Sequence, residues 1–293
     1  LLRHKYPSAL WVDLLKSEEF VRFSQSPSVL REELRASPDT RLVIIDEVQK
    51  VPALLDEVHW IIENTDVVFG LCGSSARKVR RGHANLLGGR AIRHELHGLV
   101  SDEIGRGFDV VRMLNHGYLP RHYISDSPAR LIRSYVTDYL QEEIAAEGLV
   151  RNLPAFANFL AAAALSDTAL LSYATIARDC SVASPTIKEY FQILIDTLIG
   201  AILPAYQKRP KRRVILAPKF YFHDVAVVNH LAKRGSLAPG GELFGKAFEN
   251  WVFHELSAHR DYRDQPYDLS YWRLASGLEV DFIVDDVRIA IEA

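Results

Sequence analysis

The sequence predicts an α/β protein with a parallel sheet near its N-terminal end. Three apolar runs, 9–14, 42–45 and 67–72, are separated by amphipathic segments such as 54–63. Continuous apolarity is typical of parallel strands that helices cover on both faces. Ligands of open α/β sheets bind at the carboxyl ends of such strands. The polar residues that follow the three runs there are Asp13, Asp46, Glu47, Ser74 and Ser75.

Length and composition set the class of protein. The chain has 293 residues, 48% hydrophobic and 25% charged, as expected for a soluble globular protein. No apolar run approaches the roughly 20 residues that span a bilayer, and no signal peptide is visible. Cys72 and Cys180 fit no disulfide or metal pattern, which predicts a cytoplasmic protein without a membrane partner. A net charge of −2 excludes a strongly basic protein but allows local basic patches.

Two adjacent acids, Asp46 and Glu47, end the buried strand in "RLVIIDEVQKVP". In P-loop nucleotidases an Asp at this place holds Mg²⁺, and in the ATPases an adjacent Glu polarises the attacking water. The alternative is a pair of solvated carboxylates. Ser74 and Ser75 follow the next strand, where a hydroxyl could sense a γ-phosphate. Arg90, behind two glycines in "NLLGGR", is either an arginine finger for a neighbouring subunit or a surface arginine.

Longer stretches extend these motifs across the chain, among them "VIIDEVQKVPALLDEVH", "NLLGGRA", "IARDCSVASPTIKEYFQIL" and "YWRLASGLEVDFIV". They closely resemble a prokaryotic family of AAA+-like ATPases that carry a C-terminal domain of unknown function. The resemblance implies a P-loop NTPase-like sheet with ATP and Mg²⁺ as cofactors. It also implies Asp46 and Glu47 as Walker B acids, with Asp46 on the metal. Ser74 or Ser75 would be sensor 1, and Arg90 a finger within a homo-oligomer.

One motif of that family does not occur in the chain. The family opens with G-x-x-x-x-G-K-[ST], just before the segment that matches 1–13. The phosphate-cradling amides, the Lys and the Mg²⁺-binding hydroxyl are missing with it. The chain also lacks an initiator methionine, and 289–293 end inside a predicted strand. We therefore expect a fragment of a longer protein, and weak ATP binding by the fragment alone.

Two predicted helices, 172–180 and 185–199, form a helix-turn-helix pattern after a largely helical region from about 101 to 165. Ser184 is the predicted N-cap of the second helix, and Pro185 its first residue. This unit is interpreted as a winged helix.

DNA binding is one of two interpretations of the winged helix. The second helix exposes Glu189, Gln192 and Asp196, which suit DNA phosphates poorly, although Lys188 near its start could reach a groove. The alternative is a unit for protein contacts with a solvated basic loop. A predicted wing hairpin between Ile202 and Val214 is the better electrostatic candidate. Its basic residues are Lys208, Arg209, Lys211, Arg212 and Arg213.

The terminal segment carries a third group of acids. In "LEVDFIV" the alternation places Glu279 and Asp281 on one face of a strand. A predicted helix over 244–259 carries Glu249, and the last strand adds Glu292. Glu249, Asp281 and Glu292 resemble the PD-(D/E)xK nuclease arrangement, whose carboxylates hold Mg²⁺ beside a Lys. That Lys would lie beyond Ala293. The alternative is acids on a half-exposed sheet face.

The sequence thus predicts four domains: a truncated ATPase core (1–112), a helical lid (113–165), a winged helix (166–235) and a truncated restriction-endonuclease-like α+β domain (236–293). The leading hypothesis is an AAA+-like ATPase that couples ATP hydrolysis to the last two domains. The alternatives are a DNA-binding or DNA-cleaving protein that the ATPase part regulates, and a noncatalytic interaction module.

Overall fold

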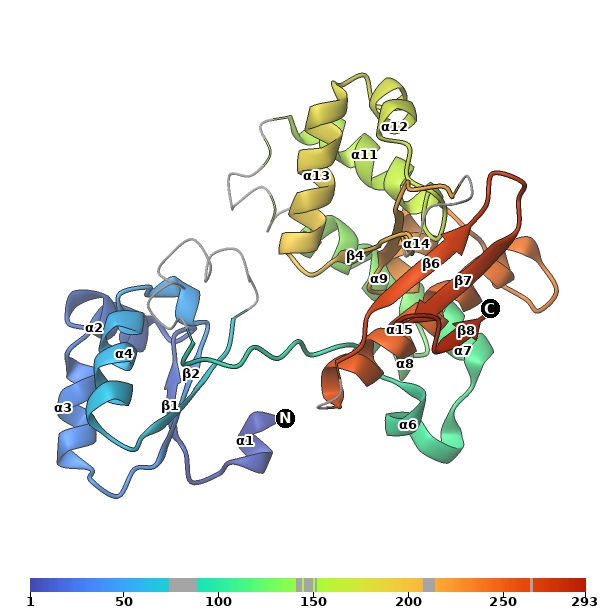
Figure 1. Cartoon of the computed structure of the whole chain (residues 1–293). Helices are drawn as coiled ribbons and strands as arrows, with labels where there is room; N and C mark the ends of the chain where they lie inside the picture. Colours follow the sequence, from blue (N-terminus) through green and yellow to red (C-terminus); the bar gives the residue numbers. More distant parts are fainter. Residues whose placement is uncertain (74–88, 141–143, 145–149, 151, 208–213, 264–265) are drawn as a thin grey trace. The chain divides into compact units, whose positions relative to one another are not determined.

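The computed structural model describes residues 1–73, 89–140, 144, 150, 152–207, 214–263 and 266–293 (Figure 1). The chain divides into two compact units, Leu1–Arg93 and His94–Ala293. Within the described ranges, no helix combines the length and the apolar character that crossing a membrane requires.

The N-terminal unit is built on a three-stranded parallel sheet with the order β1-β2-β3. Its strands are β1 (Leu10–Asp13), β2 (Leu42–Asp46) and β3 (Val68–Leu71). The prediction of three parallel strands is therefore confirmed, but the expected burial fails for β3, which has no buried residue and whose Val68 is 62% exposed. The other elements of this unit are α1 (Leu2–Lys5), α2 (Ser17–Gln25), α3 (Val29–Ala36), the 3₁₀ turn η1 (Val48–Lys50) and α4 (Leu54–Asn64).

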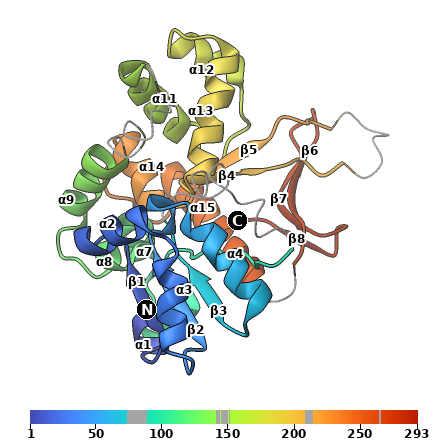
Figure 2. The same ribbon diagram turned by 90° about the vertical axis from the view of Figure 1, so that its left-hand side faces the viewer.

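The core of this unit lies between the sheet and α2, α3 and α4 (Figure 2). Val43 and Ile45 of the central strand pack in one cluster with Phe23, Leu30 and Val58 of the three helices, and all five are fully buried. Removing such a side chain from water contributes about 1.5–3 kcal/mol. The buried central strand therefore gives the edge at Asp46 a rigid base.

The second unit begins with short helices where the sequence predicts a largely helical region. Gly105 and Gly117 end two of them with positive φ angles of 64° and 86°, which glycine adopts without strain. Pro120 and Pro128 begin the next two, because proline suits the first helical turn. The elements are α6 (Ser101–Ile104), η2 (Gly105–Gly107), α7 (Val110–His116), α8 (Pro120–Tyr123), α9 (Pro128–Ser134), the π-helix η3 (Tyr135–Leu140) and α11 (Leu153–Leu165).

The two helices of the predicted helix-turn-helix are present as α12 (Tyr173–Asp179) and α13 (Ser184–Asp196). The predicted N-cap is wrong: Ser184 is the first helical residue, and the N-cap is Ala183, which has no capping side chain. Pro185 therefore takes the second helical position, where its missing N–H has no helical partner to lose.

An antiparallel pair, β4 (Gly200–Leu203) and β5 (Lys219–Phe222), follows α13. These strands flank the predicted wing, with Ile202 opposite Phe220, whereas Val214 forms an isolated bridge with Leu274. The wing hairpin itself stays a prediction. The five basic residues of the predicted wing lie outside the described residues.

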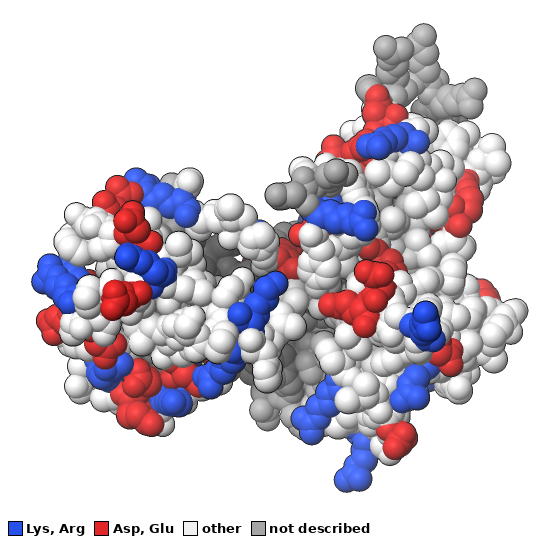
Figure 3. Space-filling view, turned by 90° about the horizontal axis from the view of Figure 1, so that it is seen from below, with Lys and Arg blue, Asp and Glu red and all other residues white. Residues whose placement is uncertain are grey.

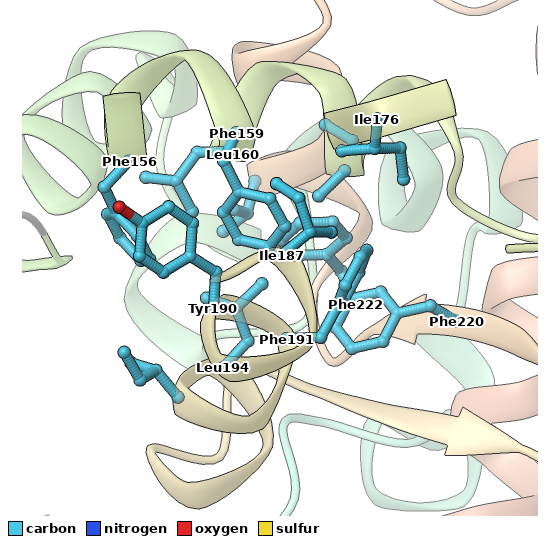
Figure 4. Packing of buried hydrophobic residues seen from close by; sticks show 14 of the residues in the cluster. Phe156, Phe159, Leu160, Ile176, Ile187, Tyr190, Phe191, Leu194, Phe220 and Phe222 are labelled. Carbon is cyan, nitrogen blue, oxygen red and sulfur yellow. The ribbon is translucent and has the colours of Figure 1, made fainter. Parts of the chain in front are cut away.

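Aromatic rings of α11, α13 and β5 pack against one another (Figure 4). The ring of Phe156 lies 5.0 Å from Tyr190, and that of Phe159 lies 4.9 Å from Phe191, edge to face in both pairs. Phe220 of β5 meets Phe191 at 4.9 Å. Such edge-to-face pairs are favourable beyond the area they bury, so α11, α13 and β5 share one core.

The terminal part contains α14 (Val225–Leu231), α15 (Glu242–Tyr262) and an antiparallel sheet, β6-β7-β8. The strands are β6 (Leu269–Arg273), β7 (Glu279–Val284) and β8 (Ile289–Ile291). The predicted helix, the strand in "LEVDFIV" and the last strand are therefore confirmed. Tyr221 of β5 stacks on Phe253 of α15 at 4.3 Å and lies 5.9 Å from Phe282 of β7. These contacts bring β5 beside α15 and β7.

Candidate functional site

Two carboxylates end neighbouring strands at one edge of the N-terminal sheet. Asp46 closes β2 and lies opposite Asp13, which closes β1. Oδ2 of Asp13 accepts a hydrogen bond of 2.9 Å from Nη2 of Arg3, and Oδ1 accepts one of 3.2 Å from the backbone N–H of Leu15. The structure therefore brings Asp13 and Asp46 together at the carboxyl ends of the strands, where the sequence predicts a ligand site.

Glu47 lies directly after β2 in a left-handed backbone conformation, with φ 59° and ψ 41°. Oε2 of Glu47 accepts a hydrogen bond of 2.6 Å from Nε2 of Gln49. The backbone N–H of Val48 donates to the carbonyl of Cys72 at 3.1 Å, which ties the turn to the end of β3. Non-glycine residues in this conformation carry strain and gather at functional sites.

Cys72 is a neighbour of the acid pair that the sequence prediction left out. Burial, together with the charges of Asp46 and Glu47, raises the pKa of the Cys72 thiol. The thiol form is a poor nucleophile, so Cys72 lines this edge as a protonated, unreactive side chain. Its position at the end of the third apolar run is the signal that could have placed it here.

Of the remaining predicted ATPase residues, Ser74, Ser75 and Arg90, the structure describes only Arg90. Ser74 and Ser75 lie outside the described residues. Arg90 is described, and its Nε donates to Oε1 of Glu63 on α4. Both side chains are more than two-fifths exposed, and exposed ion pairs contribute little to stability. The pair therefore holds Arg90 weakly.

Charges of both signs are mixed on the face of the N-terminal unit that Figure 3 shows. Ion pairs such as Arg22–Glu19 at 2.7 Å and Arg31–Glu57 at 3.6 Å belong to this unit. Mixed charges are typical of a solvated surface. In the second unit the predicted DNA contact Lys188 is exposed, with its Nζ 5.5 Å from the ring centre of Tyr173.

A second polar cluster lies in the second unit, around the ammonium group of Lys219. Its Nζ is 2.8 Å from Oε1 of Glu249, 2.8 Å from Oε1 of Glu279 and 3.6 Å from Oδ1 of Asp281. The Lys219 side chain is only 3% exposed, against 15–22% for the three acids. Strand β5 thus inserts a buried cation between carboxylates of α15 and β7.

Further donors surround the same carboxylates. The hydroxyl of Tyr221 donates to Oε1 of Glu249 at 2.6 Å, and Nη1 of Arg273 donates to Oε2 of Glu279 at 2.8 Å. Burial opposes the charge of Lys219, but the charges of Glu249 and Glu279 and their hydrogen bonds raise its pKa above the ordinary value. Lys219 is therefore a protonated ammonium at neutral pH.

The predicted metal set of Glu249, Asp281 and Glu292 is only partly assembled. Glu249 and Asp281 both face Lys219, whereas Glu292 follows the end of β8 and is exposed. Over the part of the chain that the structure describes, no three or more His, Cys, Asp or Glu side chains are placed to hold a metal ion. As arranged, Glu249, Glu279 and Asp281 surround an ammonium group, and metal binding by Glu249, Asp281 and Glu292 stays a prediction.

Lys219 and Tyr221 are cluster residues that the sequence prediction missed. A signal was present, because Lys219 stands at the head of the apolar run "KFYF". All four residues of β5 are buried. A lysine on a buried strand requires paired carboxylates, since an isolated buried charge is too costly.

Family models match three successive parts of the chain. Residues 1–105 match the model of an AAA domain. Residues 107–238 match a domain of unknown function (DUF8612), and residues 244–293 match a second one (DUF4143). No curated protein and no solved structure matches the chain. The first 105 residues are therefore similar to an AAA domain, and most of the remaining chain is similar to two domains of unknown function.

Proposed function

We propose that the AAA domain of this chain binds ATP with Mg²⁺ at the edge formed by Asp13, Asp46 and Glu47, and hydrolyses the nucleotide. The observation that carries the proposal is the position of Asp46 and Glu47 at the end of the central strand β2, with Asp13 beside them. Ligands of parallel α/β sheets bind at this edge.

Asp46 is the proposed Mg²⁺ ligand. Carboxylate oxygens are the hard donors that Mg²⁺ prefers, so the chemistry of this edge fits the ion. Bound Mg²⁺ would neutralise charge that develops on the phosphates. Asp46 is suited to hold it, because β2 is hydrogen-bonded to β1 on one side and β3 on the other. A ligand on a rigid element keeps its geometry better than one on a loop.

Glu47 is the proposed general base that orients and deprotonates the attacking water. Its hydrogen bond from Gln49 restricts the rotation of the carboxylate. The connection of Val48 to Cys72 restricts the backbone of the same turn. Both contacts support a fixed orientation for Glu47, which a base needs if it is to act on a bound water.

Ser74 or Ser75 is the proposed γ-phosphate sensor, and Arg90 the proposed finger for a neighbouring copy. A finger that acts on a neighbouring copy must reach beyond its own subunit, and the ion pair of Arg90 with Glu63 is exposed. The energy of hydrolysis would then act on the two domains of unknown function. A winged helix that binds DNA and a nuclease-like end stay predictions for those domains.

The test is the substitution Glu47→Gln, made in the chain together with any residues that its gene encodes before Leu1. Loss of the base should lower phosphate release at least about a hundredfold, while ATP binding remains. Asp56→Asn, at an exposed acid of α4, is the matched control and should leave turnover unchanged. Turnover that survives Glu47→Gln would show that the role given to Glu47 is wrong.

A further inference from the structure

The Lys219 cluster joins the two domains of unknown function. Lys219 lies within residues 107–238, whereas Glu249, Glu279 and Asp281 lie within residues 244–293. The ammonium is almost fully buried and contacts acids from two different elements, α15 and β7. A charge removed from water to this extent is tolerated only when several partners compensate it. The cluster is therefore an ionic contact between two parts of the fold.

The cluster still has more negative than positive charge. Two cations, Lys219 and Arg273, face the three carboxylates of Glu249, Glu279 and Asp281. The exposed Glu292 adds a further negative charge nearby, because burial, together with the charges of Asp281 and Glu279, raises its pKa. Such an excess favours a further cation in principle. Yet a divalent ion that shared these oxygens would lie close to the ammonium, and like charges repel strongly where water is scarce.

We propose that Lys219 is the resident cation of this cluster and excludes a divalent metal ion from it. The carboxylates are then a latent metal site, which opens only when the Lys219 side chain is withdrawn or removed. The geometry carries this inference, because the Nζ atom lies at hydrogen-bonding distance from two of the three carboxylates that would have to bind the metal. The inference concerns the contact between the two domains of unknown function and does not depend on the ATPase proposal.

The experiment measures Mn²⁺ binding by the full chain from the loss of the electron paramagnetic resonance signal of free Mn²⁺. Asp46→Asn is present throughout, so that the proposed Mg²⁺ ligand of the N-terminal edge is removed from every variant. With Lys219 in place, adding Asp281→Asn should not change Mn²⁺ binding. Lys219→Met should create a site that binds Mn²⁺ at least about tenfold more tightly, because a neighbouring positive charge is gone. That gain should disappear in Lys219→Met/Asp281→Asn.

Lys246→Met is the matched control. Lys246 lies on α15 and pairs with Glu242 at 2.7 Å, but its side chain is 40% exposed. Removing it should leave Mn²⁺ binding unchanged. Thermal unfolding followed by circular dichroism accompanies each variant. Lys219→Met/Glu249→Gln relieves the unpaired charge that Lys219→Met creates, and it should also gain Mn²⁺ binding if the single variant does not fold.

Two results would overturn the proposal. One is Mn²⁺ binding by the chain with Lys219 intact that Asp281→Asn abolishes, because the ammonium would then not exclude the metal. This arm needs no substitution of Lys219. The other is a folded Lys219 variant that binds no more Mn²⁺ than the chain with the lysine.

Discussion

Nε2 of Gln49 donates a hydrogen bond of 2.6 Å to Oε2 of Glu47, across the turn that ends β2. The turn leaves the sheet at Asp46 and bends at Glu47. The left-handed backbone of Glu47 starts the 3₁₀ turn that contains Gln49. Backbone conformation and side-chain contact together fix the direction of the carboxylate.

The first prediction concerns the contribution of Gln49 to turnover. Gln49→Ala should lower kcat of ATP hydrolysis about tenfold, because a hydrogen bond to a charged group contributes about 1.5–3 kcal/mol. ATP affinity should not change, since Gln49 acts through Glu47. Lys50→Ala, at the next and exposed residue, is the control. Equal losses of kcat in the two variants would argue for damage to the turn as a whole.

The second prediction concerns the backbone strain at Glu47. Because an alanine at φ 59° retains the steric cost of the left-handed region, Glu47→Gly should be more stable than Glu47→Ala by about 1 kcal/mol. Urea unfolding of both variants measures the difference. At Glu32, an exposed position within α3, the order should reverse, because glycine weakens a helix. A lower stability for Glu47→Gly would mean that the turn relaxes.

The third prediction separates the two interpretations of Arg90. An arginine finger contributes about 10³-fold or more to turnover, so Arg90→Ala should lower kcat by that order. Glu63→Gln breaks the same exposed pair and should change kcat little. Steady-state phosphate release by both variants distinguishes the two interpretations of Arg90. Similar turnover in Arg90→Ala and the unsubstituted chain would identify Arg90 as a surface arginine.

The N-terminal site could be predicted from the sequence because its signals are local. Continuous apolar runs predict buried parallel strands, and the acids follow them directly, so Asp46 and Glu47 could be placed from the residues on either side. The left-handed conformation of Glu47 carried no such signal, since glycine or asparagine is the usual marker of φ above zero. The hydrogen bond from Gln49 depends on that conformation, so it could not be predicted from the sequence either.

The Lys219 cluster could not be predicted in the same way. Glu279 and Asp281 were placed on one face of a strand by simple alternation, and the structure confirms that both face the cluster. Their partner Lys219 lies far earlier in the sequence, on a strand whose neighbours are set by aromatic packing of Tyr221. Such a pairing is a property of the tertiary fold, which no local pattern reports.

The last prediction concerns the buried carboxyl of Asp167, in the second unit, and its effect on how stability depends on pH. Asp167 is 1% exposed and accepts hydrogen bonds from the backbone N–H of Phe222 at 2.9 Å and from Nδ2 of Asn250 at 3.1 Å. Burial outweighs these bonds and raises the pKa of Asp167 from 3.8 to about 7. Burial lowers the pKa of His223 and of His254 from 6.5 to about 4.

These shifts act on stability in opposite directions. Between about pH 4 and pH 7 the folded chain keeps a proton on Asp167 that the unfolded chain releases, so this residue makes stability fall as the pH rises. Between about pH 4 and pH 6.5 the unfolded chain binds protons on His223 and His254 that the folded chain does not, so the histidines make stability rise. Asp167 therefore masks part of the effect of the histidines.

Asp167→Asn should remove the contribution that makes stability fall as the pH rises, and it should leave the opposite contribution of His223 and His254. The free energy of unfolding of this variant, relative to the unsubstituted chain, should increase with pH by up to about 1.4 kcal/mol per unit between pH 4.5 and 6.5. Urea unfolding of both proteins at several pH values in this range measures the slope. Asp179→Asn, at an exposed residue of α12, should show a difference that does not vary with pH. A constant difference for Asp167→Asn as well would mean that Asp167 is ionised in the folded chain, because only a carboxyl that stays protonated on folding makes stability fall as the pH rises through this range.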